Sequence, residues 1–118
     1  DMPTRLRIGP YDYTVECTET AARDSQDRAD SNGTVGYCRY REALITILPS
    51  LVESVKRETL LHEVIHACTH VAYMTHGGKF TPEEVNGRVA PVLLDTLRRN
   101  PSLVAYLCEG ENTGGMEG

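Results

Sequence analysis

Hydrophobic and polar residues alternate in four short segments of the N-terminal half, and this pattern predicts four β-strands. The first two, Arg5 to Ile8 and Tyr11 to Cys17, flank Gly9-Pro10. A turn signal between two alternating segments is typical of a β-hairpin. The next two, Thr34 to Tyr40 and Ala43 to Leu48, are rich in β-branched residues, which favour strands. The pattern therefore predicts a small antiparallel or mixed sheet built from two strand pairs.

The segment between the two strand pairs, residues 18–33, is polar throughout. Its sequence, TETAARDSQDRADSNG, contains no large apolar residue. A polar stretch of this length within a compact domain is typical of a functional or a mobile loop. We expect a mobile loop here. Residues 109–118 are Gly-rich and polar, and we expect this tail to fray.

Helical periodicity follows the strands. We expect a helix that begins between Leu51 and Ser54 and ends near Met74. Its apolar residues cover most of the circumference: Leu60, Leu61, Val64, Ile65, Ala67, Cys68, Val71 and Ala72. A helix that is apolar nearly all round is typical of a buried central helix. Polar side chains within such a helix cost free energy unless a partner satisfies them.

A second helix is predicted to begin after Thr81. Thr81 suits the N-cap and Pro82 the first helical position, where its missing N–H does no harm. Glu84 is the third helical residue and completes a Thr-x-x-Glu capping box. The helical period continues to Leu97, and Pro91 predicts a kink between Gly87 and Pro91.

Asn100-Pro101 predicts the start of a last short helix, Ser102 to Cys108, by the same capping logic. Strands followed by helices are typical of the α+β class. With 118 residues the chain is long enough for one core and too short for two. We therefore predict a single α+β domain over residues 1–118, in which a small sheet packs on a central helix and two C-terminal helices follow.

The central helix contains the motif His62-Glu63-Val64-Ile65-His66. Residues i and i+4 of a helix lie one turn apart on the same face, so His62 and His66 can hold one metal ion together. Glu63 directly follows the first of them, where its carboxylate can reach a water on that metal and take its proton. A bound metal would also satisfy the polar side chains of this apolar helix. The motif therefore predicts a catalytic Zn²⁺ site with Glu63 as the general base.

Catalytic zinc usually has three protein ligands and one open position, so a third ligand is expected. His70 lies eight residues beyond His62, about 12 Å along a continuous helix, which is too far for bonds of about 2 Å. Asp95 lies deep in the next helix and is expected to be too far along it. His76 follows the central helix in a turn and can fold back toward the metal.

Glu83 and Glu84 open the second helix, which must pack against the first to bury its apolar residues. Glu84 is engaged in the capping box, so Glu83 is the first choice, with His76 and Glu84 as alternatives. The simpler interpretation of both glutamates is that acidic residues in a first turn favour the helix dipole. We predict one Zn²⁺ ion held by His62, His66 and Glu83.

Charge and cysteine usage narrow the possible partners and compartment. A net charge of −5 and an isoelectric point near 5.3 argue against a nucleic-acid partner, which needs a clustered basic face. No apolar run approaches a membrane span, and no signal peptide opens the chain. The four cysteines are scattered without a Cys-x-x-Cys pair, which disfavours a four-cysteine zinc site. We expect reduced thiols in the cytoplasm, with Cys68 buried on the central helix.

Three stretches of the sequence, RIGPYDYTVE, TLLHEVIHA and EEVNGRVAPVLLDTLRRNPSLVAYL, resemble the small zinc peptidases found in phage and prophage genomes. The chain is thus similar to the zincin metallopeptidases. This resemblance implies a minimal zincin-like domain in the host-cell cytoplasm. By analogy with gluzincins it favours Glu83 as the third ligand. The metzincin extension is absent because Thr69 and Ala72 replace the required Gly and His.

One further stretch of the sequence supports His76 as a candidate for the third zinc ligand. HGGKF, residues His76 to Phe80, resembles the His-Gly-x-x-Phe segment of SprT-like proteases, whose histidine binds zinc. The same resemblance therefore implies a second candidate ligand, seven residues before Glu83.

We expect a zinc-dependent metalloendopeptidase that hydrolyses peptide bonds of a protein or peptide substrate. Glu63 would activate the water and then return the proton to the leaving amine. Candidates for stabilising the oxyanion are Tyr40, Tyr73, His70 and His76. The strand pair from Thr34 to Leu48 can offer an edge strand to an extended peptide, although its simpler interpretation is an ordinary sheet edge.

Two alternatives remain open from the sequence. One is a non-catalytic module in which zinc only stabilises the fold while the domain binds a host protein. Glu63 argues against it, because a purely structural site gains nothing from a base. The other is a regulator that cleaves one specific repressor, which has the same site and a narrower substrate range. The oligomeric state and the identity of the substrate do not follow from the sequence.

Overall fold

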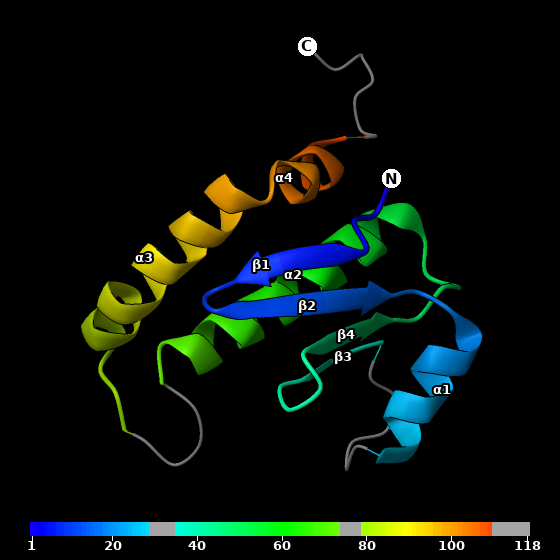
Figure 1. Ribbon diagram of the computed structural model, residues 1–118, viewed down its shortest axis with the longest axis horizontal. Coiled ribbons are helices and arrows are strands. Elements are labelled where there is room, and N and C mark those ends of the chain that lie inside the picture. Colours follow the sequence, from blue (N-terminus) through cyan, green and yellow to red (C-terminus); the bar gives the residue numbers. More distant parts are fainter. Residues whose placement is uncertain (29–34, 74–78, 110–118) are drawn as a thin grey trace.

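The computed structural model describes residues 1–28, 35–73 and 79–109, and within these residues the chain forms four strands and four helices (Figure 1). The fold is the predicted α+β domain. The elements in chain order are β1 (Arg5–Ile8), β2 (Tyr11–Glu16), α1 (Glu19–Arg28), β3 (Gly36–Arg39), β4 (Leu44–Ile47), α2 (Glu53–Val71), α3 (Pro82–Arg99) and α4 (Pro101–Cys108). Among the described residues, no helix combines the length and the apolar composition needed to cross a bilayer.

The sheet is mixed and has the strand order β1-β2-β4-β3. The two predicted strand pairs form antiparallel hairpins, β1 with β2 and β3 with β4. They join through a parallel pairing of β2 with β4, in which Val15 lies opposite Ile45. Parallel strands need a crossover connection rather than a tight turn, and α1 lies in this crossover. The strand β3 is therefore at one edge of the sheet.

Alternation along the strands places the core between the sheet and α2, which lies behind the sheet in Figure 1. Inward residues of three strands and α2 are almost fully buried: Leu6, Ile8, Tyr13, Val15, Ile45, Ile47, Leu60, Val64, Ala67 and Cys68. Leu103 and Tyr106 bring α4 into the same cluster. Burial of these side chains is the main term that holds α2 on the sheet. The expected position of Cys68 in the core is confirmed.

The prediction of a loop over residues 18–33 is wrong for α1. Thr18 accepts a hydrogen bond from the backbone N–H of Ala21 at 3.0 Å, as an N-cap does. Ala22 is buried, and Asp24 lies 3.7 Å from Arg39 of β3. A cap, an alanine contact and an ion pair thus hold a helix that has no large apolar residue. Residues 29–34, the end of the predicted loop, lie outside the described residues. So do residues 110–118, which make up most of the tail that we expect to fray.

The expectation that α2 is buried all round is also wrong. One side of the helix is buried and consists of Thr59, Leu60, Glu63, Val64, Ala67 and Cys68. The opposite side carries exposed His62 and His66, and Ile65 is 40% exposed. The reason lies in α3, whose first turns leave this side uncovered. Residues 82–88 of α3 are all exposed.

The start of α3 is as predicted. Thr81 accepts a hydrogen bond from Glu84 N–H at 3.1 Å, and the Glu84 carboxylate accepts one from Thr81 N–H at 2.9 Å. This confirms the capping box. Pro91 lies inside a single helix that continues to Arg99, so the kink near Gly87 to Pro91 stays a prediction.

Asn100 does not cap α4 with its side chain, contrary to the prediction. Its amide instead donates to the carbonyls of Arg7 at 2.8 Å and Thr96 at 2.7 Å, and its oxygen accepts from Arg7 N–H at 2.9 Å. Asn100 is buried, so these bonds satisfy the polar atoms of its side chain together with the buried carbonyl of Thr96. They fasten the C-terminal end of α3 to β1.

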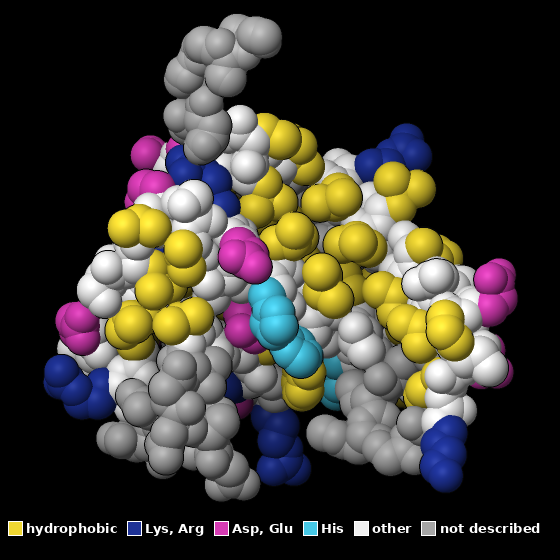
Figure 2. Space-filling model, turned by 180° about the vertical axis from the view of Figure 1, so that it is seen from behind, with side chains coloured by type: hydrophobic (Ala, Val, Ile, Leu, Met, Phe, Trp, Pro, Cys, Tyr) yellow, Lys and Arg dark blue, Asp and Glu magenta, His cyan; other side chains and the backbone are white. Residues whose placement is uncertain are grey.

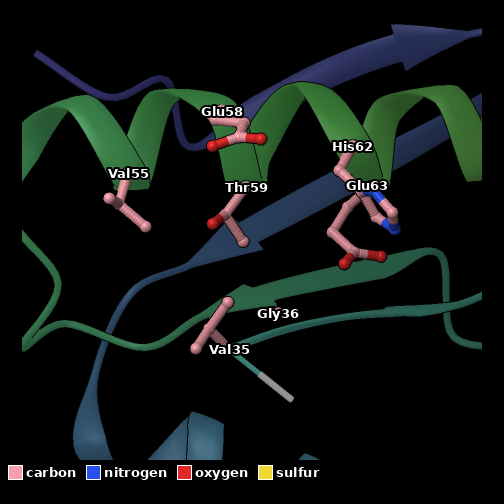
Figure 3. Close-up of a pocket in the computed structure, with 7 residues that line it drawn as sticks. All are labelled: Val35, Gly36, Val55, Glu58, Thr59, His62 and Glu63. Carbon is pink, nitrogen blue, oxygen red and sulfur yellow. The ribbon is translucent and has the colours of Figure 1, made fainter.

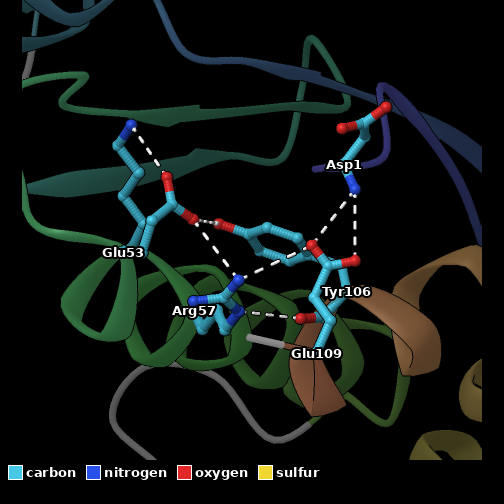
Figure 4. A network of polar contacts seen from close by, with 6 residues as sticks. Asp1, Glu53, Arg57, Tyr106 and Glu109 are labelled. Carbon is cyan, nitrogen blue, oxygen red and sulfur yellow. Dashed lines mark hydrogen bonds and ion pairs between the residues drawn. The ribbon is translucent and has the colours of Figure 1, made fainter. Parts of the chain in front are cut away.

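A second polar cluster joins α4 to the beginning of α2 (Figure 4). Arg57 donates to the Tyr106 carbonyl at 2.9 Å and lies 3.5 Å from Glu109 and 3.6 Å from Glu53. The Tyr106 hydroxyl donates to Glu53 at 3.3 Å. Burial, followed by the Glu53 charge, raises the pKa of Tyr106 to about 12. These contacts orient α2, the helix that carries the HExxH motif.

Candidate metal centre

His62 and His66 face each other across one turn of α2. Their Nε2 atoms are 3.2 Å apart, and the rings meet edge to face at 69°. Two nitrogens bound to a tetrahedral zinc at 2.0–2.1 Å lie about 3.3–3.4 Å from each other. The observed separation fits such a site, although it also allows a hydrogen bond between the rings. In the space-filling view, histidine side chains reach the surface between areas of hydrophobic side chains (Figure 2).

Desolvation, and then the neighbouring His62, lowers the pKa of His66. A lowered pKa favours the neutral imidazole, which is the form that binds a metal. The pair therefore has the spacing that zinc requires, and His66 also tends toward the required protonation state.

Glu63 projects from the buried side of α2 toward β3 (Figure 3). It is only 4% exposed, and no described residue donates a hydrogen bond to its carboxylate. Burial alone raises its pKa to about 7. A buried carboxylate without a protein donor is costly, and such groups are common at functional sites.

Gly36 of β3 allows the close contact between this strand and α2. A Cβ atom at this position would lie 2.6 Å from Thr59 Cγ2 and 3.0 Å from Glu63 Oε2. Any side chain there would displace one of the two. Gly36 is not among the site residues predicted from the sequence. An isolated glycine inside a predicted strand is, however, a known sign of close backbone approach, so Gly36 could have been identified from the sequence in this way.

A cavity of about 220 Å³ brings the motif residues and β3 together. It is lined by Gly36, Tyr37, Cys38, Tyr40, His62, Glu63 and His66. The thiol of Cys38 is not a nucleophile here, because burial, followed by the charge of Glu63, raises its pKa to about 12. The cavity thus combines two imidazoles, a buried carboxylate and two tyrosines in one place.

The candidates for oxyanion stabilisation lie in different places. Tyr40 lines the cavity, and its ring stacks on His70 with centroids 4.2 Å apart and planes 6° from parallel. Burial, and then Cys38 and Glu63, raises the Tyr40 pKa, so the phenol keeps its proton near neutral pH and can donate a hydrogen bond. Tyr73 is 86% exposed and lines none of the described cavities. His76 lies outside the described residues.

The candidates for the third ligand that the structure describes, Glu83, Glu84 and Asp95, do not gather at the histidine pair. Glu83 is exposed in the first turn of α3, and Glu84 is engaged in the capping box. Asp95 lies 3.4 Å from Arg99 on the far part of α3. Over residues 1–28, 35–73 and 79–109, no group of three His, Cys, Asp or Glu is arranged to hold a metal ion. The described residues thus assemble two of the predicted ligands and the predicted base.

Comparison with known proteins agrees with this arrangement at the family level. Searches of curated proteins and of solved structures found no match. The family model for SprT-like proteins matches residues 12–86, which is more than half of the chain. The match extends from β2 through the whole of α2 to the first turns of α3 and includes every residue that lines the cavity. Proteins of this kind are related to the zincin-like metallopeptidases. The chain therefore belongs to the SprT-like family.

Proposed function

We propose that the protein is a zinc-dependent peptidase in which His62 and His66 bind one zinc ion and Glu63 is the general base. One observation carries the proposal: two imidazole nitrogens lie 3.2 Å apart beside a buried carboxylate from the intervening turn. Membership of the SprT-like family supports it, since this family is related to zinc peptidases.

In the proposed reaction, the zinc ion and the side chains of the protein have different roles. A zinc ion held by His62 and His66 would supply Lewis acidity, which would polarise the peptide carbonyl and make water a stronger acid. Glu63 accepts the proton from the attacking water and passes it to the nitrogen of the leaving amine. Tyr40 donates a hydrogen bond to the oxygen on which negative charge develops. Its stack on His70 holds the phenol ring in place.

The substrate that we propose is an extended segment of a protein or peptide. The strand β3 lies at the sheet edge and lines the cavity, and in the described residues it pairs only with β4. Backbone groups on its free edge can add a substrate strand. Such binding would carry the scissile bond past Glu63.

Two residues compete for the third ligand position. Glu83 was the first choice from the sequence, and its carboxylate has no capping role. The SprT-like family favours His76, because His76 to Phe80 resembles the segment whose histidine binds zinc in SprT-like proteases. We therefore propose His76 ahead of Glu83. The variants His76→Ala and Glu83→Ala separate the two: the true ligand, when removed, lowers zinc content at limiting metal, and the other variant keeps it.

The substitution Glu63→Gln tests the proposed function itself. It removes the base and leaves both imidazoles intact, so zinc content stays at one ion per chain while peptide cleavage falls by at least about a thousandfold. Glu16→Gln is the matched control, since Glu16 is an exposed carboxylate at the end of β2. Cleavage by Glu63→Gln at the parent rate would overturn the role of Glu63. A zinc-loaded parent protein that cleaves no peptide would point to a zinc-stabilised binding module instead.

A further inference from the structure

A second cavity of about 250 Å³ adjoins the one that contains the histidine pair. It lies between the first half of α2 and the beginning of β3 (Figure 3). Its lining consists of Val35, Gly36, Val55, Glu58, Thr59, His62 and Glu63. Three of these residues, Gly36, His62 and Glu63, also line the first cavity. The second space therefore lies directly beside the reaction centre.

The size of this cavity suits one side chain. At about 30 Å³ per water molecule, the volume corresponds to about eight waters. Pockets for whole small-molecule ligands begin at about 300 Å³, so this space is small for a cofactor. A single amino-acid side chain that enters from the adjoining cavity fits it better.

The lining has an apolar wall and a charged rim. Val35, just before β3, and Val55 of α2 face each other, and Thr59 turns its methyl group toward Gly36. Glu58 is exposed at the rim, and among the described residues it forms no ion pair. A long side chain with an aliphatic stem and a cationic end matches both features, because the stem lies on apolar surface while the charge stays near water.

We propose that this cavity receives the substrate side chain next to the scissile bond and selects Lys or Arg there. Val35, Val55 and Thr59 contact the aliphatic stem, and Glu58 pairs with the cation. An acidic side chain is disfavoured because Glu58 repels it at the rim. This inference rests on the proposed peptidase function, and it adds a substrate class to it.

Cleavage of a peptide library by the zinc-loaded protein tests the subsite. The library varies the residues on both sides of the cut, and mass spectrometry identifies each cleavage site. The parent protein is expected to prefer Lys or Arg at one of the two flanking positions. Val55→Phe fills the cavity and should lower kcat/KM for those peptides by at least about tenfold, while peptides with Gly at that position lose little.

Reversing the charge of Glu58 at the rim of the cavity is the second test of the subsite. Glu58→Lys should reduce the preference for Lys and Arg over Glu by about two- to fivefold, which is the usual range for one exposed charge pair. Val104→Phe is the matched control for Val55→Phe, because Val104 is 38% exposed on α4, Val55 is 37% exposed, and only Val55 lines the cavity. Zinc content and thermal unfolding show whether each variant is folded.

The outcomes separate the subsite from the reaction. Cleavage without a preference at either flanking position overturns the subsite and leaves the peptidase function standing. A preference for Lys or Arg that persists in both Val55→Phe and Glu58→Lys also overturns the subsite and leaves the peptidase function standing. If Val55→Phe does not fold, the exposed Glu58→Lys variant decides alone. A parent protein with bound zinc that cleaves no library member overturns both proposals.

Discussion

The two sides of the candidate site differ in how firmly the fold holds them. On the side of the sheet, β3 touches α2 so closely that residue 36 has no room for a side chain, and Glu63 is buried against it. On the side of α3, residues 82–88 are all exposed, including Glu83 and Val85. Packing therefore places the base and the helix that carries both imidazoles, whereas the exposed beginning of α3 is not held in this way.

The two ends of α3 also differ in how firmly the fold holds them. The capping box defines where the helix begins, but it acts within four residues and does not fix the helix against the rest of the domain. The other end is fixed by Asn100, whose bonds to Arg7 and Thr96 join it to β1. The beginning of α3 thus has little packing against the rest of the domain, and a metal ion would tie it to α2 only with Glu83 as the third ligand.

The largest expected effect comes from breaking the packed side. Gly36→Ala places a Cβ 2.6 Å from Thr59 Cγ2 and 3.0 Å from Glu63 Oε2, so Thr59 must shift and Glu63 must move by a few tenths of an ångström. Because displacing a reacting group by about 1 Å costs on the order of a hundredfold in rate, we expect kcat to fall by about ten- to a hundredfold with zinc content unchanged. Gly87→Ala is the control on the loose side: a Cβ there meets nothing within 4 Å, and alanine favours the helix. Equal kcat for Gly36→Ala and the parent would show that the contact does not position Glu63.

The fastened end of α3 gives the largest expected effect on stability. Asn100→Ala removes three hydrogen bonds and leaves two part-buried backbone groups of Arg7 and the buried carbonyl of Thr96 without these partners, so the free energy of unfolding should fall by about 2–4 kcal/mol. Urea denaturation measures the change. Asn100→Asp keeps the acceptor for Arg7 N–H but loses both donors. Its free energy of unfolding should therefore be no higher than that of the alanine variant. A loss below about 0.5 kcal/mol for Asn100→Ala would contradict the anchoring role.

A more moderate effect is expected within the cavity. Tyr40→Phe removes the proposed donor and should lower kcat by at least about tenfold with KM and zinc content nearly unchanged. His70→Phe keeps an aromatic ring to stack on Tyr40, whereas His70→Ala does not, so the alanine variant should lose more activity. A loss confined to KM would assign Tyr40 to substrate binding alone.

The smallest expected effect lies on the loose side. Val85 is 37% exposed at the beginning of α3, so Val85→Ser should change the free energy of unfolding by no more than about 0.5 kcal/mol in the metal-free protein. If Glu83 is the third ligand, addition of zinc should slow amide hydrogen exchange near the start of α3 and leave β4 unchanged. Strong exchange protection of residues 82–88 without zinc would mean that this end is already held.

Sequence patterns predicted what depends on neighbours along the chain. All four strands, the α3 capping box and the spacing of His62 and His66 follow from local periodicity and local hydrogen bonds. The helix α1 was missed because the buried side chain among its described residues is only an alanine, Ala22, supported by a cap and an ion pair with β3.

Features set by distant partners were not predictable in this way. Asn100 bonds to Arg7, 93 residues away, so its local sequence suggested a cap that it does not form. Periodicity reports how apolar α2 is, but not whether another element covers each side, so the exposure of Ile65 was missed. At the site, the motif identified the chemical groups. The contact of Gly36 with Glu63 appears only when strand and helix are brought together.

The parallel junction between β2 and β4 has a consequence for how the domain reaches its native state. Each hairpin can close early and on its own, because its strands are near neighbours in sequence. Docking one hairpin beside the other must instead bring residues about thirty positions apart into register, at a higher entropic penalty. We expect this docking to limit the refolding rate, so that weakening the Val15–Ile45 junction slows refolding more than an equal weakening inside either hairpin.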